Sequence, residues 1–495
     1  LGEVPVQQPA FPAEIVNARM AVSQDRNTIF VVGSIALNTH FAFHYSVPTQ
    51  AFTSRCASLA REPVRFASIS PDGNRFMGGH MLFDRSLRVL ADFVATGQLP
   101  IQVAPAVPTA PPPNAPAPRP AQVIGGTEFS RDGSTIYASL VETGTRALAP
   151  LLYVLDSDNL TTRDRILIPD RLTGKMVSDA AGSRLYALSE SGLTVLPISE
   201  LGSARLAGTS LDTISFRFNV CTRQAATATF EVQHRGAGAV DFRLSSDMPG
   251  LTFSPAAGAT PARITATFDP ELLFNVRGTT TGLIQIASNG AVNLPDPVRV
   301  LVNLQDSDQR GTIFVQGGTL RDLVIDEVRE KFYILDSERN RLLVFDLNDF
   351  SLRKTVRTGY FPLHMAVARD GRTMLVTNAQ SETISIINLD SLEPEGLIFC
   401  PCSAYPRSIA VSTNATLVTT AVDRPTVLRT ADNQQVQVIV TEGRMNRVEL
   451  AARIARQIST MGIFINQLSP KSLLVATPSG SRILIAEDVG PTGGN

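Results

Sequence analysis

A chain of 495 residues is too long for one compact hydrophobic core, unless that core is divided among repeated units. Its 44 basic and 45 acidic residues balance, so its charge points to neither a nucleic-acid partner nor an anionic membrane surface. No apolar run approaches the roughly 20 residues that a membrane-spanning helix needs. Val, Ile, Thr, Phe, Gly and Pro are plentiful, which favours an all-β chain.

The chain opens with an extended segment and continues with a repeat. Residues 1–18 contain three prolines and suit an edge strand or strap, and the start at Leu1 fits a processed or a trimmed N-terminus equally. Over residues 19–205, short strands alternate with tight turns. The third residues of four successive turns are spaced 47, 60 and 49 apart: Asp25, Asp72, Asp132 and Ala181. This period is typical of a β-propeller, so we expect blades one to four here.

The one long spacing has a visible cause in residues 104–120, which are rich in proline. Proline lacks the N–H group of a β-ladder and favours a polyproline II conformation. Two interpretations stay open for this tract. It is either an exposed, stiff loop between blades two and three or a docking strip for a partner protein.

The repeat disappears over residues 206–308, where short alternating strands take its place. We expect strands over residues 214–220, 227–232, 240–244, 262–268, 282–287 and 298–304. About 100 residues with six or seven such strands predict an immunoglobulin-like sandwich. The run Met248–Pro255, followed by Thr260 and Pro261, resembles the Ig-like and BACON-like modules of secreted bacterial proteins.

The propeller repeat resumes over residues 309–495. Its clearest unit is 361–391, with predicted strands at 363–368, 373–377 and 383–389 and a glycine turn after Asp370. This unit resembles one repeat of the YVTN-type β-propellers, with Leu375–Asn378 at the position of their name-giving tetrapeptide. Turn markers at Val328, Asp370 and Asn414 are spaced 42 and 44 apart. We therefore expect a seven-bladed propeller, or an eight-bladed one if the last repeat is completed.

The last repeat starts a blade that the sequence does not finish. Residues 446–459 fit a strand as well as a helix, and their position in the repeat favours a strand. Two strands over residues 472–476 and 482–486 then lack partners in the short Gly/Pro-rich tail. An open strand edge is a template for another strand, from the first segment of this chain or of a neighbouring copy. The strand-exchange candidates are Val4, Val6, Ile15, Val16, Leu473, Val475, Ile483 and Ile485.

Residues with metal-ligand or redox chemistry are few and scattered. His40 and His44 share a strand face, without an identifiable third metal ligand. The pairs in Asp156–Asp158 and Asp306–Asp308 offer oxygen ligands for calcium, but solvated turns explain them more simply. The disulfide candidates are Cys56, Cys400 and Cys402, while Cys221 stands alone in the sandwich. We predict no metal and no cofactor.

The sequence carries no nucleophile elbow, P-loop or H-E-x-x-H motif. Resemblance to the lactonase-like and cytochrome-d1-like rings implies ligands at an axial channel, but no residue set matches theirs. We therefore expect a secreted, non-catalytic structural or interaction protein that binds proteins, copies of itself included, and self-associates into a polymer or surface layer. A small glycan or cell-surface ligand stays open. The alternative is a lactonase-like or other hydrolytic propeller with an axial-channel site.

Overall fold

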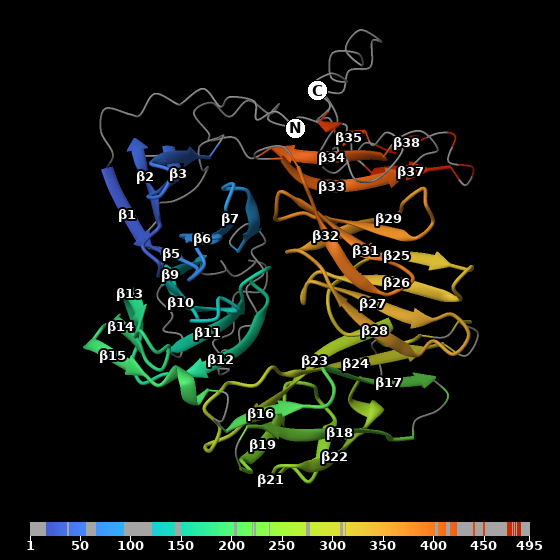
Figure 1. Ribbon diagram of the computed structural model, residues 1–495. Helices are drawn as coiled ribbons and strands as arrows, with labels where there is room; N and C mark the ends of the chain where they lie inside the picture. The colour runs from blue at the N-terminus through green and yellow to red at the C-terminus, as the bar shows by residue number, and fades with distance from the viewer. Residues whose placement is uncertain are drawn as a thin grey trace, which may run out of the picture.

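The protein is all-β, as predicted. A computed structural model describes residues 16–36, 39–55, 66–93, 121–143, 150–201, 205–219, 221, 224–236, 238–273, 278–306, 310–311, 313–400, 404–411, 416–422, 439–440, 449–450, 473–477, 479, 481 and 483–486. Apart from two short 3-10 turns, its elements are strands (Figure 1). Within these ranges no helix is long and apolar enough to cross a membrane.

Four sheets form a first array, in which strands pair antiparallel in chain order. This meander is the blade unit of a β-propeller. The first strands of successive sheets, β1, β5, β9 and β13, pack against one another. The strands are β1 (Val16–Val22), β2 (Thr28–Ala36), β3 (Thr39–Ser46) and β4 (Ala51–Ser54); β5 (Ala67–Ile69), β6 (Arg75–Gly78), β7 (Met81–Asp84) and β8 (Val89–Asp92); β9 (Ala121–Phe129), β10 (Thr135–Thr143), β11 (Leu151–Asp156) and β12 (Thr162–Leu167); β13 (Leu172–Ser178), β14 (Leu185–Ser189) and β15 (Gly192–Leu196).

The repeated turn of these blades is held by its aspartate. In the third blade the Ser130 hydroxyl donates to Asp132 at 2.6 Å, and the Ser134 backbone N–H donates to the same carboxylate at 3.1 Å. The Ser130 hydroxyl first, and then the Ser134 groups, lower the pKa of Asp132. Gly133 follows with φ +71°, which a residue with a side chain rarely adopts. The spacing found in the sequence therefore reports a local hydrogen-bonded turn.

A second array repeats the pattern after the insert. Its first strands, β25, β29, β33 and β37, again pack in order. Two sheets have four strands each, and two hairpins follow. The strands are β25 (Leu320–Asp326), β26 (Lys331–Asp336), β27 (Arg341–Asp346) and β28 (Leu352–Arg357); β29 (Pro362–Val367), β30 (Thr373–Asn378), β31 (Thr383–Asn388) and β32 (Glu393–Phe399); β33 (Ala404–Val411) and β34 (Thr416–Val422); β37 (Leu473–Ala476) and β38 (Ile483–Ala486), with a short β35–β36 pair (Ile439–Val440, Glu449–Leu450).

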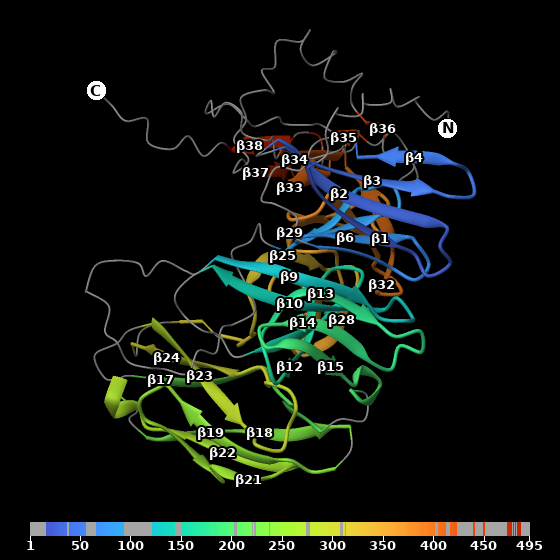
Figure 2. The ribbon, with the colours of Figure 1, turned by 90° about the vertical axis from the view of Figure 1, so that its left-hand side faces the viewer.

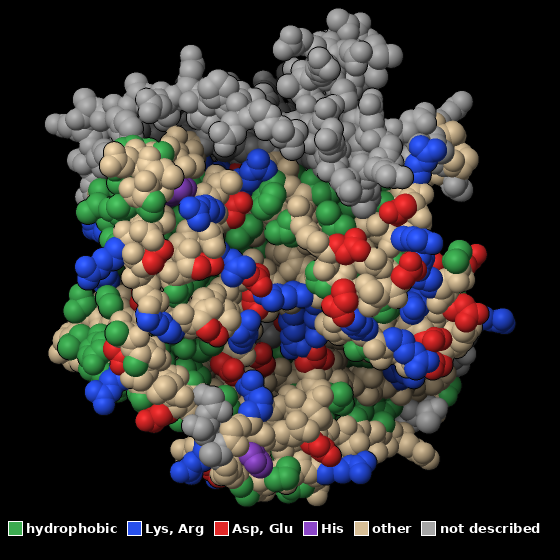
Figure 3. All heavy atoms as spheres, viewed as in Figure 1, with side chains coloured by type: hydrophobic (Ala, Val, Ile, Leu, Met, Phe, Trp, Pro, Cys, Tyr) green, Lys and Arg blue, Asp and Glu red, His purple; other side chains and the backbone are tan. Residues whose placement is uncertain are grey.

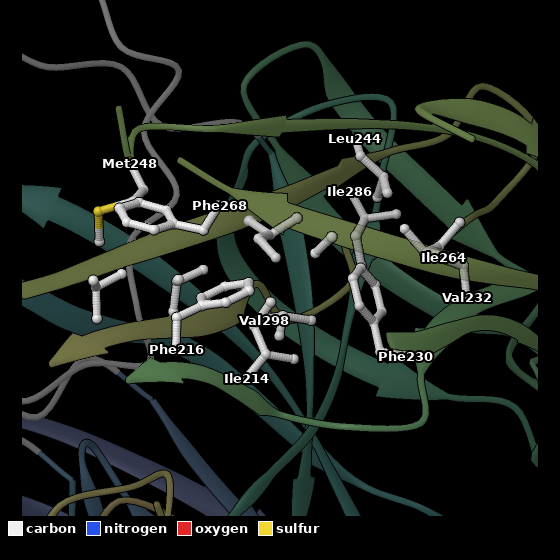
Figure 4. Close-up of a cluster of buried hydrophobic side chains, with 14 of the residues drawn as sticks. Ile214, Phe216, Phe230, Val232, Leu244, Met248, Ile264, Phe268, Ile286 and Val298 are labelled. Carbon is white, nitrogen blue, oxygen red and sulfur yellow. The ribbon is translucent and has the colours of Figure 1, made fainter. Parts of the chain in front are cut away.

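The insert is a sandwich of two sheets. One sheet has the order β16-β18-β22-β20, and the other β17-β24-β23-β19-β21, with β17 and β24 parallel. Sixteen buried apolar residues from both sheets form one core, drawn in part in Figure 4. The strands are β16 (Leu206–Thr209), β17 (Thr213–Asn219), β18 (Ala226–Arg235), β19 (Asp241–Ser246), β20 (Leu251–Ser254), β21 (Ala257–Ala259), β22 (Ala262–Phe268), β23 (Gly278–Ala287) and β24 (Val298–Gln305).

The two arrays lie beside each other, and the sandwich lies against the lower ends of both in the view of Figure 1, as Figure 2 also shows. Turns of the first array meet turns of the second. Phe93 stacks on Tyr360 with ring centroids 6.5 Å apart, and both belong to a buried cluster with Leu155 of the third blade. The arrays therefore share a core in addition to their separate blade cores.

The structure differs from the sequence prediction at several edges. β1 begins at Val16, inside the predicted strap of residues 1–18, because it continues past a register shift to pair with Ser34. β16, β20 and β21 were missed because they are only three or four residues long. The proline-rich tract 104–120 lies outside the described residues, as does most of 446–459.

Candidate functional site

The charged junction between the arrays is the strongest candidate for a site. Figure 3 shows Lys and Arg side chains gathered in the middle of one face, between the two arrays, with acidic side chains among them. We define the junction by five residues: Arg75, Asp156, Asp158, Arg163 and Arg357. They come from β6, β11, the turn after it, β12 and β28, so the fold assembles them from both arrays.

Each junction carboxylate forms ion pairs with two guanidinium groups. Asp156 is buried and binds Arg163 at 2.6 Å and Arg357. Asp158 binds Arg357 at 2.8 Å and Arg75. Burial, and then the charge of Arg75, lower the pKa of Arg357. The carboxylate oxygens of Asp156 and Asp158 were candidate calcium ligands. In the structure they contact arginine guanidinium groups instead.

Neutral amides reinforce the junction. The Asn159 side chain donates to the Thr358 carbonyl at 2.8 Å, from the first array to the second. In return, the Asn340 side chain donates to the Thr161 hydroxyl, also at 2.8 Å. Both asparagines are buried, where an unmade hydrogen bond would cost about 1–3 kcal/mol. These two hydrogen bonds fix the position of one array relative to the other.

A buried ion pair forms a second contact between the arrays. Arg55, which follows β4, binds both carboxylate oxygens of Glu382 in the turn before β31. The side chains are 2% and 0% exposed, so the pair lies outside water. The Val89 backbone N–H donates to Glu382 at 2.8 Å, and Arg55 donates to the Leu87 carbonyl at 2.7 Å. This geometry satisfies a bidentate pair that would be costly if broken.

Three of the histidines, His40, His44 and His80, lie in the first two blades. His44 is buried, stacks on Phe76 and lies 2.9 Å from the Arg85 carbonyl through Nε2. Burial, and then the charge of His80, lower the pKa of His40. His80 Nδ1 lies 2.8 Å from Asp92, a contact that the sequence analysis missed. In the part of the chain that the structure describes, no group of three or more His, Cys, Asp or Glu side chains could hold a metal ion.

A polar cavity of about 310 Å³ opens beside the junction, between β12, β16 and residues 293–297. Three arginines that line it are each paired with an aspartate: Arg165 with Asp296, Arg235 with Asp164 and Arg339 with Asp212. Burial, and then the charge of Arg341, lower the pKa of Arg339 to about 10. The cavity walls are therefore ionic but locally balanced in charge.

The disulfide candidates are only partly within the described residues. Cys400 is a free, buried thiol, and Cys56 and Cys402 lie outside the described residues. Burial, and then the charge of Glu382, raise the pKa of Cys400 well above its ordinary value. Cys400 is thus protonated at neutral pH, which is the less reactive form of a thiol.

The strand-exchange candidates fall into three places. Val16 belongs to β1, while Val4, Val6 and Ile15 lie outside the described residues. Leu473 and Val475 of β37 are exposed, and the Leu474 backbone N–H between them donates to the Ser408 hydroxyl of β33. β38 contains Ile483 and Ile485 and pairs with β37 as a hairpin. The exchange itself stays a prediction.

Comparisons with known proteins do not identify a family. No protein-family model and no curated protein matches the sequence. The dihydro-heme d1 dehydrogenase NirN in complex with DHE aligns at 13% identity, with a TM-score of 0.24, over 77% of this chain; the chain spans 65% of that protein. The C-terminal WD40 domain of Sif2 aligns at 9% identity, with a TM-score of 0.23, over 95% of this chain and 93% of that domain.

Hydrazine synthase of Kuenenia stuttgartiensis aligns at 11% identity, with a TM-score of 0.25, over 80% of this chain and 99% of that one. At such scores the likenesses carry no argument about fold or function. The assignment of propeller-type blades therefore rests on the sheets themselves, with their antiparallel order and their packing from first strand to first strand.

Proposed function

We propose that this protein is an extracellular, non-catalytic scaffold that binds other proteins, copies of itself included. In this proposal the scaffold is a propeller of seven blades and part of an eighth, interrupted by an immunoglobulin-like sandwich. The observation that carries it is the set of ion pairs around the junction and the cavity. These pairs join the two arrays and the sandwich to one another.

The sandwich is held from both sides by these groups. On the side of the first array, Arg235 of β18 binds Asp164 of β12. On the side of the second array, Arg299 of β24 binds Glu338 at 2.9 Å, and Arg339 binds Asp212. Paired charges favour one geometry of the parts that they join. These ion pairs therefore support a scaffold in which the two arrays and the sandwich keep one arrangement.

The experiment that tests the proposal is the assembly state of the purified full chain. Sedimentation velocity from nanomolar to high micromolar concentration, with negative-stain images of the same samples, should show concentration-dependent assemblies of defined shape. A chain that remains a monomer over this range, and that captures no defined protein partner, would contradict the proposed role.

The hydrolytic alternative is favoured by one observation, the ionic cavity of about 310 Å³. An enzyme acting there would use Asp164 or Arg339, which lie on its wall. A panel of lactones and simple esters should give no turnover above the blank if the scaffold proposal is right. Hydrolysis that is abolished by Asp164→Asn or Arg339→Met, but not by Asp349→Asn on the exposed surface, would replace it.

A further inference from the structure

The last sheet of the first array has an exposed apolar face. The cross-strand pairs Tyr186–Val195 and Leu188–Leu193 put these side chains on one side of the β13–β15 sheet, and Val177 pairs with Tyr186 on the same side. Leu193 is 64% exposed and Leu188 52%. Figure 3 shows apolar side chains gathered at the lower left, over β14 and β15. We call these five residues the blade-4 face.

The first sheet of the second array has an exposed apolar face as well. Leu323 and Ile325 of β25 are exposed, and they pair with Ile334 and Phe332 of β26, which are partly buried. We call these four residues the blade-5 face. Single exposed apolar residues are ordinary, but two sheet faces of this kind are an interaction signal.

The blade-5 face corresponds to the side of a blade that packs on the preceding blade. Leu323 pairs with the fourth residue of β26, and Met365 pairs with the fourth residue of β30, so the two occupy the same place in successive blades. Met365 is 5% exposed because it packs on the preceding blade, whereas Leu323 is 56% exposed. Leu323 therefore stands where a preceding blade would cover it.

The blade-4 face corresponds to the opposite side of a blade, on which the following blade packs. Counted from the turn markers Ala181 and Val328, Leu188 is equivalent to Leu335 of β26, and Tyr186 to Tyr333. Leu335 and Tyr333 are fully buried, and they share one core cluster with Met365. A sheet placed on the blade-4 face would thus reproduce a contact that the second array already contains.

The two faces do not cover each other within this chain, since Leu193 and Leu323 are both more than half exposed. We propose that the blade-4 face of one copy packs on the blade-5 face of a second copy. The contact continues the blade stacking of each array from one molecule into the next. Because it joins two different patches, it repeats head to tail and builds a filament unless the rotation closes a ring.

This inference rests on the proposed self-association, and it is tested by mixing two full-length variants that each carry one introduced cysteine. Leu193→Cys and Leu323→Cys are each made in a Cys221→Ser background, since Cys221 is exposed. Under mild oxidation, the mixture should give a disulfide-linked dimer, while either variant alone should give none. The background chain reports any bond formed by the remaining native cysteines.

The other outcomes overturn the proposal in distinct ways. A third variant carries both Leu193→Cys and Leu323→Cys in the same background, and a cross-link within one of its chains shows that the chain covers its own faces. A cross-linked dimer from either variant alone shows a symmetric contact instead. An associating chain with no cross-link in the mixture refutes this contact but leaves the proposed function standing. A monomer at all concentrations refutes this contact together with self-association, and it refutes the proposed function only if the chain also captures no protein partner.

A second measurement does not depend on cysteine chemistry. Leu193→Glu and Leu323→Glu should each weaken association at least about tenfold in sedimentation experiments, because each buries a charge in the contact. Leu272→Glu is the matched control, since Leu272 is equally exposed but lies on the sandwich. An equal loss in all three variants would overturn the assignment of the two faces.

Discussion

The sandwich and the array junction hold their parts together by opposite means. The sandwich closes two sheets over one continuous apolar core, with Phe268 at its centre between Phe216 and Phe218. The junction closes two arrays with ion pairs and buried amides around Asp156 and Asn159. Apolar burial involves no charge that salt could screen or protons could neutralise, whereas charge pairing responds to both. The two regions should therefore fail under different conditions.

The largest expected effect is a cavity in the sandwich. Phe268 is fully buried, with its ring 5.5 Å from those of Phe216 and Phe218. Phe268→Ala should lower the free energy of unfolding of the sandwich by about 3–5 kcal/mol. Calorimetry of the full chain should show the loss in one transition at both low and high salt. Leu272→Ala, at an exposed position, should change little, and equal losses would show that the core is not continuous.

A slightly smaller effect is expected at the buried pair between the arrays. Glu382→Leu removes the carboxylate that neutralises the buried Arg55 guanidinium and should cost about 3 kcal/mol. Arg55→Met combined with Glu382→Leu should recover most of that loss in urea unfolding, because no unpaired charge then remains. Glu393→Gln breaks the exposed pair with Lys354 and should cost almost nothing. A double variant as unstable as Glu382→Leu would refute the pairing argument.

The junction itself should give a graded and salt-dependent response. Asp156→Asn removes a buried acceptor of two arginines and should cost about 2 kcal/mol at low salt. Asp158→Asn, at a half-exposed position, should cost below about 1 kcal/mol, and less again at high salt because the pairs are screened. Chemical unfolding at two salt concentrations separates these cases. The reverse order of the two losses would sink the assignment of Asp156 as the centre.

The smallest expected effect is one of pH at Glu128 of β9. Burial raises the pKa of Glu128, although Ser178 donates two hydrogen bonds to its carboxylate. An acid with a raised pKa stabilises the fold below its unfolded pKa, and this contribution is lost as pH rises through the folded pKa. Glu128→Gln should therefore raise the free energy of unfolding at pH 7 and leave it unchanged near pH 4.

Thermal unfolding at the two pH values measures this shift, and Asp132→Asn is a control of opposite sign. The Ser130 hydroxyl and the other donors lower the pKa of Asp132, so its contribution is present above the unfolded pKa and lost on acidification. Asp132→Asn should destabilise the chain at pH 7 and lose that effect in acid. A Glu128→Gln variant that is stabilised equally at both pH values would contradict the burial argument.

Sequence reasoning reached the fold because blade signals are local. The Ser130-to-Asp132 turn closes within five residues, and the alternation of β24 can be read along a single strand. The order of blades and insert followed from the spacing of these turns. Short strands such as β21 were missed because three residues carry too little periodicity.

The sequence by itself therefore determined the all-β class and the repeat of propeller-type blades. Only the tertiary structure decided which charges meet: Arg55 and Glu382 lie 327 residues apart, and no periodicity links them. It also decided that Leu188 is exposed while its equivalent Leu335 is buried. The physical reason is that strand and turn patterns depend on near neighbours along the chain, whereas burial and ion pairing depend on which surfaces pack together.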